Sequence, residues 1–96
     1  MKTLLQKHAQ KILDTMEAQK PLEAYDIMSL ERTLHLAEPK ERDQHLRTVL
    51  RNIINRYYNG ISLGLIILDL SVALNFSLYG TMPEDSWDRL REIYNP

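Results

Sequence analysis

Residues 61–79 read ISLGLIILDLSVALNFSLY, and the role of this stretch decides the fold. Its apolar residues surround almost the whole circumference of a helix, as in a membrane span or a helix buried in a bundle. Asp69 lies at the middle, where an acidic residue costs about 2.5–3.5 kcal/mol in a bilayer. Each leucine or isoleucine returns only about 0.3–0.6 kcal/mol, so insertion comes close to break-even. We therefore expect residues 61–79 to form a helix that ends at Gly80 and lies at the centre of a bundle.

The polar residues of this stretch support the bundle. Gly64, Ser71 and Asn75 share one narrow sector of the helix, where small side chains would let a neighbouring helix approach closely. Inside a bundle Asp69 must reach solvent at the rim or pair with a cation. The candidates lie on the preceding antiparallel helix: Arg47, Arg51 or Arg56.

Upstream of this stretch, the apolar spacing predicts three further helices. The first covers residues 2–19 and ends at Lys20-Pro21, since the residue before proline is steered out of the helical region. Pro21 then suits the first position of a second helix, which extends to about Ala37 with Tyr25 on its apolar stripe. Glu38-Pro39 is a second signal of the same kind, which ends one helix and allows the next to begin. The third helix therefore covers residues 39–58 and stops at Asn59-Gly60.

The end of the chain predicts a fifth, short helix. Residues 81–84 (TMPE) fit a capping box, in which Thr81 accepts from a backbone N–H and Glu84 reaches back. Trp87, Leu90 and Tyr94 then share one side. The predicted fold class is therefore all-α: one domain over residues 1–96, a compact antiparallel bundle of four to five helices with a buried central fourth helix. The expected core contains Leu5, Ile12, Met16, Leu30, Leu34, Leu46, Val49, Leu50, Ile53, Leu63, Ile67, Leu70, Leu74 and Leu78.

Composition narrows the class of protein. Ninety-six residues are too few for two stable cores, and three glycines with four prolines favour long helices over many short strands. Twelve basic and thirteen acidic residues give a net charge of −1, which argues against a dedicated nucleic-acid binder. The chain has no cysteine, and its N-terminus becomes polar too early to supply a signal-peptide core. We expect a cytoplasmic protein that does not enter the membrane.

No pattern predicts catalysis or a cofactor. The sequence has no nucleophile elbow, no phosphate-binding glycine loop and no dinucleotide fingerprint. The three histidines, His8, His35 and His45, lack the spacing that places two imidazoles on one metal. We expect no enzyme, no cofactor and no metal site.

Protein recognition remains as the expected function. Tryptophan, tyrosine and arginine dominate binding hot spots, and six such residues form the expected partner-binding set: Arg47, Arg51, Tyr58, Trp87, Arg91 and Tyr94. We expect a small module that binds and modulates a larger protein, as an inhibitor, adaptor or antitoxin-like regulator, with a homodimer as a further possibility. One alternative is a nucleic-acid-binding accessory protein that uses the basic face of the third helix. Another is an immunity-type or membrane-associated helical bundle.

Overall fold

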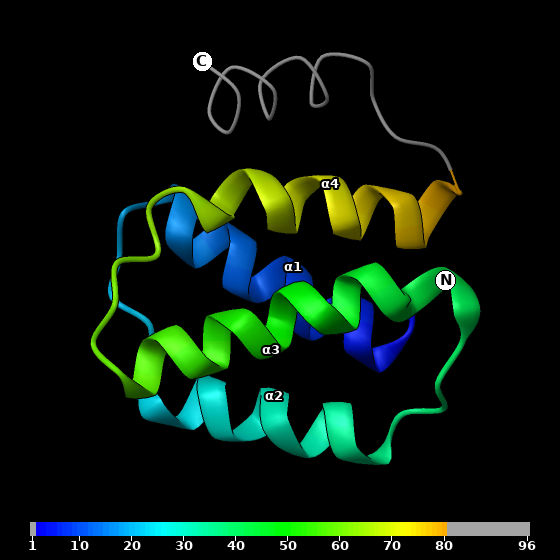
Figure 1. The fold of residues 1–96 in the computed structure, drawn as a ribbon, viewed down its shortest axis with the longest axis horizontal. Helices are drawn as coiled ribbons and strands as arrows, with labels where there is room; N and C mark the ends of the chain where they lie inside the picture. Colours follow the sequence, from blue (N-terminus) through cyan, green and yellow to red (C-terminus); the bar gives the residue numbers. More distant parts are fainter. Residues whose placement is uncertain (1, 81–96) are drawn as a thin grey trace.

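The chain forms four α-helices and one short 3₁₀ turn. The structure is a computed structural model that describes residues 2–80. Its elements are α1 (Leu4–Glu17), α2 (Ala24–Leu36), η1 (Glu41–Asp43), α3 (Gln44–Tyr58) and α4 (Ile66–Tyr79), and no strand occurs within this part of the chain. Consecutive helices run in opposite directions (Figure 1). The prediction of an all-α antiparallel bundle is confirmed.

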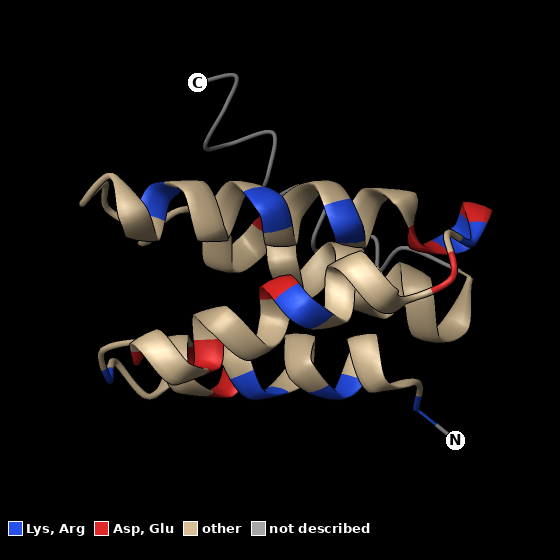
Figure 2. Ribbon diagram, turned by 90° about the horizontal axis from the view of Figure 1, so that it is seen from below, with Lys and Arg blue, Asp and Glu red and all other residues tan. Residues whose placement is uncertain are grey.

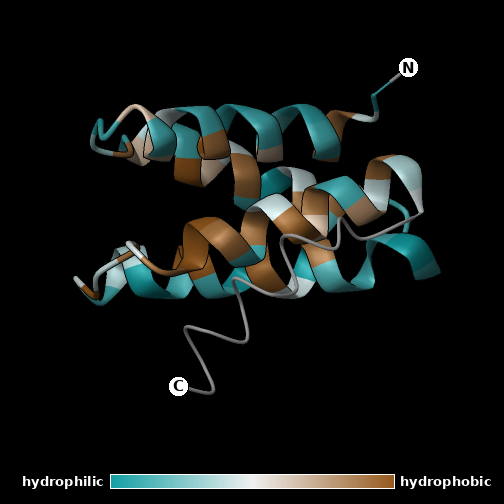
Figure 3. Ribbon diagram, turned by 90° about the horizontal axis from the view of Figure 1, so that it is seen from above, coloured by the Kyte–Doolittle hydropathy of each residue, from teal (hydrophilic) through white to brown (hydrophobic). Residues whose placement is uncertain are grey.

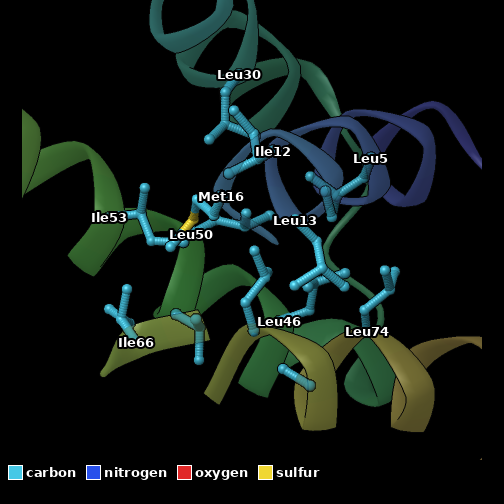
Figure 4. Packing of buried hydrophobic residues seen from close by; sticks show 14 of the residues in the cluster. Leu5, Ile12, Leu13, Met16, Leu30, Leu46, Leu50, Ile53, Ile66 and Leu74 are labelled. Carbon is cyan, nitrogen blue, oxygen red and sulfur yellow. The ribbon is translucent and has the colours of Figure 1, made fainter. Parts of the chain in front are cut away.

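The core lies where the four helices meet. α4 packs against both α1 and α3, and α2 packs against the same two helices from the other side. Leucines and isoleucines of all four helices converge between them (Figure 4). Every predicted core residue belongs to this cluster or packs against it; Leu63, Ile67 and Leu78 are the three that are only partly buried. The apolar α4 therefore buries its inward side against its own neighbours.

All four helices begin later than the sequence predicted, and two of these differences follow a proline. Pro21 is not the first residue of α2, because the chain stays extended as far as the N-cap residue Glu23 and the helix begins at Ala24. Likewise α3 begins at Gln44, after the 3₁₀ turn, and not at Pro39. Proline is compatible with the start of a helix but does not require one, so tertiary packing sets the boundary.

The fourth helix is shorter than the 19-residue apolar stretch. Residues 61–65 form a turn, in which Nη1 of Arg56 donates to the backbone oxygen of Ser62 at 3.0 Å. Gly64 consequently lies outside the helix, and the predicted small-residue sector is wrong. The small residues that α4 buries are Ala73 and Ser77. None of the helices in residues 2–80 combines the length and apolarity that crossing a bilayer requires.

A capping box is present at the beginning of α1, where the sequence analysis did not find it. The Thr3 hydroxyl accepts from the backbone N–H of Gln6 at 3.2 Å, and the Gln6 side chain accepts from the Thr3 N–H at 2.9 Å. This pair satisfies two N–H groups that a helix start otherwise leaves unpaired. The second predicted capping box, at residues 81–84, lies outside the described residues, as does the predicted helix after it.

Candidate interaction surface

The three arginine and tyrosine residues predicted on the third helix all lie on the side of α3 that faces α2. Nη2 of Arg47 donates to the backbone oxygen of Leu34 at 3.0 Å, in the last turn of α2. The Tyr58 hydroxyl donates to the Glu31 carboxylate, also on α2. Both side chains therefore hold α3 to α2, and Arg51 lies on the same side of the helix with its side chain exposed. Trp87, Arg91 and Tyr94, the other predicted partner-binding residues, lie outside the described part of the chain.

Arg51 lines an open groove between α2 and α3. The groove has a volume of about 680 Å³, and its walls include Arg51 and Tyr58 from α3 and His35 and Arg32 from α2. The hydrogen bond to Glu31 raises the pKa of the Tyr58 hydroxyl above its ordinary value, because ionisation would place a second negative charge beside the carboxylate. The groove therefore presents the exposed side chains of Arg51 and Tyr58 for contact.

A second, more apolar surface lies on the outward side of α2. We define the α2 face as Tyr25, Met28, Arg32 and Leu36, which lie at i, i+3, i+7 and i+11 of the helix. Tyr25 is 73 % exposed, Met28 64 % and Leu36 69 %. Tyr25 was expected on the buried stripe, and that prediction is wrong. Ile27, Leu30, Thr33 and Leu34 form the inward side, and Tyr25 falls on the opposite side of the helix.

The charged residues of α2 are Asp26, Glu31 and Arg32, and the first of them pairs with α1. Figure 2 shows charged positions on α1, α2 and α3 alike. Lys11 of α1 reaches across to Asp26 of α2, with 2.7 Å between Nζ and Oδ1. This contact raises the pKa of Lys11, chiefly through the hydrogen bond to Asp26 and then through its charge. The ion pair fixes the edge of the α2 face toward α1 and leaves the apolar side chains outward.

The α2 face ends at a pocket. Its volume is about 340 Å³, and Leu36 and Ala37 of the α2 end face Leu4 and Leu5 of the α1 start across it. The loop before η1 contributes Lys40 and Glu38, and the buried Asp43 closes the inner wall. This volume suits one or two apolar side chains of a ligand, with charges of both signs at the rim.

Behind the pocket lies a buried polar network that the sequence did not predict. Nε2 of Gln6 donates to Oγ of Ser77 at 2.9 Å, and the Ser77 hydroxyl donates to Oδ1 of Asp43. Arg42 adds a contact of 3.7 Å between its Nε and the same carboxylate oxygen. The sequence analysis did not single out Asp43. The one feature of the sequence that could have indicated a structural role for Asp43 is its position immediately before an amphipathic helix, where aspartate is common.

The described residues hold little that resembles catalytic machinery. Asp43, the most buried acid among them, accepts from the Ser77 hydroxyl and lies 3.7 Å from Nε of Arg42, so the groups around it form a structural network. Within residues 2–80 no three histidine, aspartate or glutamate side chains gather closely enough to hold a metal ion. What the arrangement offers chemically is surface: an apolar face, a pocket at its end and a groove beside it.

Comparison of the chain with protein-family models, with curated proteins and with solved structures found no match.

Proposed function

We propose that the protein is a non-enzymatic interaction module that binds and modulates a larger protein through the α2 face. The observation that supports this most directly is the exposure of Tyr25, Met28 and Leu36 on one side of a helix whose other side is buried. A few large apolar side chains exposed singly are normal on a soluble protein. Three on one helix side, grouped around an arginine, form a continuous strip of the residue types that interfaces favour.

The pocket beside Leu36 gives the strip an anchor point. Hot-spot residues of a partner typically insert into a pocket near the centre of an interface and exclude water there. An amphipathic helix of the partner, laid along the α2 face, would place one apolar side chain in this pocket. Arg51 and Tyr58 would then meet the partner from the neighbouring groove.

The nucleic-acid alternative has less support. This alternative uses the basic face of α3, where Arg47 and Arg51 lie. Arg47 is half-buried and donates to the α2 backbone, so the Arg47 guanidinium is not presented outward. Phosphate binding needs several exposed cations on one surface. The net charge of −1 and the position of Arg47 together favour a protein partner.

The test compares three full-length chains in affinity purification: wild type, Met28→Glu and Asn52→Glu. Both substitutions add one negative charge at an exposed helical position, but Asn52 lies on the outer side of α3, away from the α2 face. We expect one protein to co-purify stoichiometrically with the wild type and with Asn52→Glu and to be lost with Met28→Glu. Equal recovery from all three chains, or recovery of nucleic acid in place of protein, would overturn the proposal.

A homodimer through the same face gives a different result. In that case purified wild type would sediment as a dimer and Met28→Glu as a monomer, with no second protein needed. That outcome would keep the α2 face as an interface but reject the larger protein as its occupant.

A further inference from the structure

The buried carboxylate of Asp43 has one oxygen that the fold does not use. Asp43 is 3 % exposed and lines the inner wall of the pocket between the beginning of α1 and the end of α2. Its Oδ1 accepts from the Ser77 hydroxyl and lies 3.7 Å from Nε of Arg42. Within residues 2–80, its Oδ2 takes part in no hydrogen bond or ion pair, and the side chain does not cap α3. One acceptor atom of this carboxylate therefore remains unused.

The unused oxygen opens to the pocket. Nη1 of Arg47 is the one side-chain polar atom of the described chain that is fully buried without a hydrogen-bond partner. Because Oδ2 of Asp43 is not such an atom, it keeps an accessible surface, and Asp43 lines the pocket. A carboxylate oxygen without a protein partner is tolerated only while water reaches it, since its burial without a donor is costly. A group that fills the pocket must therefore bring a hydrogen-bond donor to Oδ2.

The outer part of the same pocket is apolar. Leu4 and Leu5 from the first turn of α1 face Leu36 and Ala37 from the end of α2 across it. Figure 3 shows the beginning of α1, next to the N-terminus, as a hydrophobic segment. Leu4 is 63 % exposed and Leu36 69 %, so both walls are accessible to a ligand. The pocket thus combines an apolar mouth with a hydrogen-bond acceptor at its inner wall.

The charges around the pocket favour a neutral donor over a cation. Arg32 and Lys40 line the pocket together with Glu38 and Asp43, and Arg42 lies against Asp43. Three cations therefore stand around two acids. A lysine or arginine side chain that entered the pocket would meet like charges, and like charges brought together at an interface oppose binding. An uncharged N–H or O–H group meets no such repulsion.

We propose that the pocket receives a tyrosine side chain of the partner, whose ring lies between the leucines and whose hydroxyl donates to Oδ2 of Asp43. This site rests on the proposed function, because the tyrosine belongs to the partner that lies along the α2 face. Tyrosine combines a large apolar ring with one donor at its end and is enriched among hot-spot residues. The fold itself contains a contact of this kind, in which the Tyr58 hydroxyl donates to the Glu31 carboxylate. Hydrogen bonds to a charged acceptor are also the stronger ones.

Three small probes test the site in the purified wild-type chain: p-cresol, toluene and n-butylammonium. p-Cresol is the side chain of tyrosine, toluene lacks the hydroxyl, and n-butylammonium is the side chain of lysine. We expect p-cresol to shift the amide signals of Leu36, Ala37 and Lys40 and to bind with a Kd at least about threefold lower than either other probe. Toluene, the more apolar molecule, would bind more tightly if the pocket offered burial alone. Tighter binding of toluene or n-butylammonium, or unchanged signals with p-cresol, would overturn the proposal.

Asp43→Asn tests the acceptor, and Glu38→Gln is its matched control. Each variant replaces a carboxylate that lines the pocket with an amide of the same shape. We expect the preference for p-cresol over toluene to be lost in Asp43→Asn and kept in Glu38→Gln, with circular dichroism verifying that both chains keep their helices. A preference that survives in Asp43→Asn, or that both variants lose equally, would contradict the contact with Asp43. If Asp43→Asn does not fold, the ranking of the three probes in the wild type still decides.

Failure of the tyrosine site can be told apart from failure of the proposed function. If toluene binds best while Met28→Glu still loses the partner, the tyrosine is rejected, and the partner remains bound to the α2 face through another apolar side chain. If p-cresol binds as expected while recovery of the partner is equal from all three chains of the affinity purification, the proposed function is overturned. The pocket would then remain a site for a phenolic small molecule.

Discussion

The amide of Gln6 donates to the hydroxyl of Ser77 at 2.9 Å, across 71 positions of the sequence. The same amide nitrogen also donates to the Ser77 backbone oxygen at 3.1 Å, and the Ser77 hydroxyl donates a hydrogen bond to the Asp43 carboxylate. All three residues are 3 % exposed or less. The network joins the start of α1, the end of α4 and η1, so it closes one end of the bundle.

Replacing Ser77 with alanine removes a single oxygen atom but should lower the free energy of unfolding clearly. The Gln6 amide and the Asp43 carboxylate would each lose a partner while still buried, and such a loss costs about 1–3 kcal/mol. Urea unfolding followed by circular dichroism measures the difference. Ser71→Ala, a half-buried serine on the same helix, is the control and should change the free energy of unfolding by less than about 0.5 kcal/mol. Equal effects of the two substitutions would show that the network contributes nothing.

Truncation in the core should be far more costly. Leu70 and Ile53 are completely buried, and Leu70→Ala or Ile53→Ala should lower the free energy of unfolding by about 2–5 kcal/mol through lost burial and the cavity left behind. Met28→Ala removes a side chain from the exposed α2 face and should cost no more than about 0.5 kcal/mol. Thermal and urea unfolding of the three variants provides the check. A costly Met28→Ala would mean that the α2 face is already covered within the chain.

Replacing Arg47 should lower the stability of the fold, whereas replacing Arg51 should weaken binding of the partner. Arg47→Ala removes the donor to the Leu34 oxygen, one of the carbonyls that the end of α2 leaves without a helical partner, and should cost about 1–2 kcal/mol. Arg51→Ala should leave the free energy of unfolding within about 0.5 kcal/mol of wild type. The same pair in the affinity purification should show weaker recovery of the partner with Arg51→Ala. A destabilising Arg51→Ala with a neutral Arg47→Ala would invert the assignment.

The hydrogen bond between Tyr58 and Glu31 predicts an alkaline titration. The Tyr58 hydroxyl has a pKa raised above its ordinary value of 10.0, mainly because it donates to Glu31. The stabilisation is therefore complete below pH 10.0 and is lost as the pH rises through the folded-state pKa. Ultraviolet titration of wild type minus Tyr58→Phe should isolate this group. Glu31→Gln should move the difference curve toward lower pH, and an unchanged curve would refute the contact.

Helix interiors were predictable from the sequence because their apolar residues recur at the helical period. Residues such as Leu46, Leu50 and Ile53 lie one turn apart, and burial follows from that spacing alone. Tyr25 was misassigned because α2 carries apolar residues on two opposite sides, with Tyr25 and Met28 on one and Ile27 on the other. Only the packing of α2 against α1 and α3 decides which side is inward.

Boundaries and the buried network could not be predicted, since both depend on contacts distant in sequence. The turn at residues 61–65 is held by Arg56 of the preceding helix, which no local apolar pattern reveals. Asp43 is buried because α4 returns beside η1 and brings Ser77 to it. Among the predicted partner-binding residues, Arg47 and Tyr58 are both bonded to α2, and no local pattern in the sequence indicates these contacts.

A double-mutant cycle between Gln6 and Ser77 tests most directly whether α4 packs inside the bundle. The assignment of the α2 face as an outward surface depends on this packing. Free energies of unfolding are measured for wild type, Gln6→Ala, Ser77→Ala and the double variant. The packing of α4 against α1 predicts a coupling energy of about 0.5–3 kcal/mol between the two positions. Strictly additive effects would mean that the start of α1 and the end of α4 do not meet, and the bundle described for this chain would be contradicted.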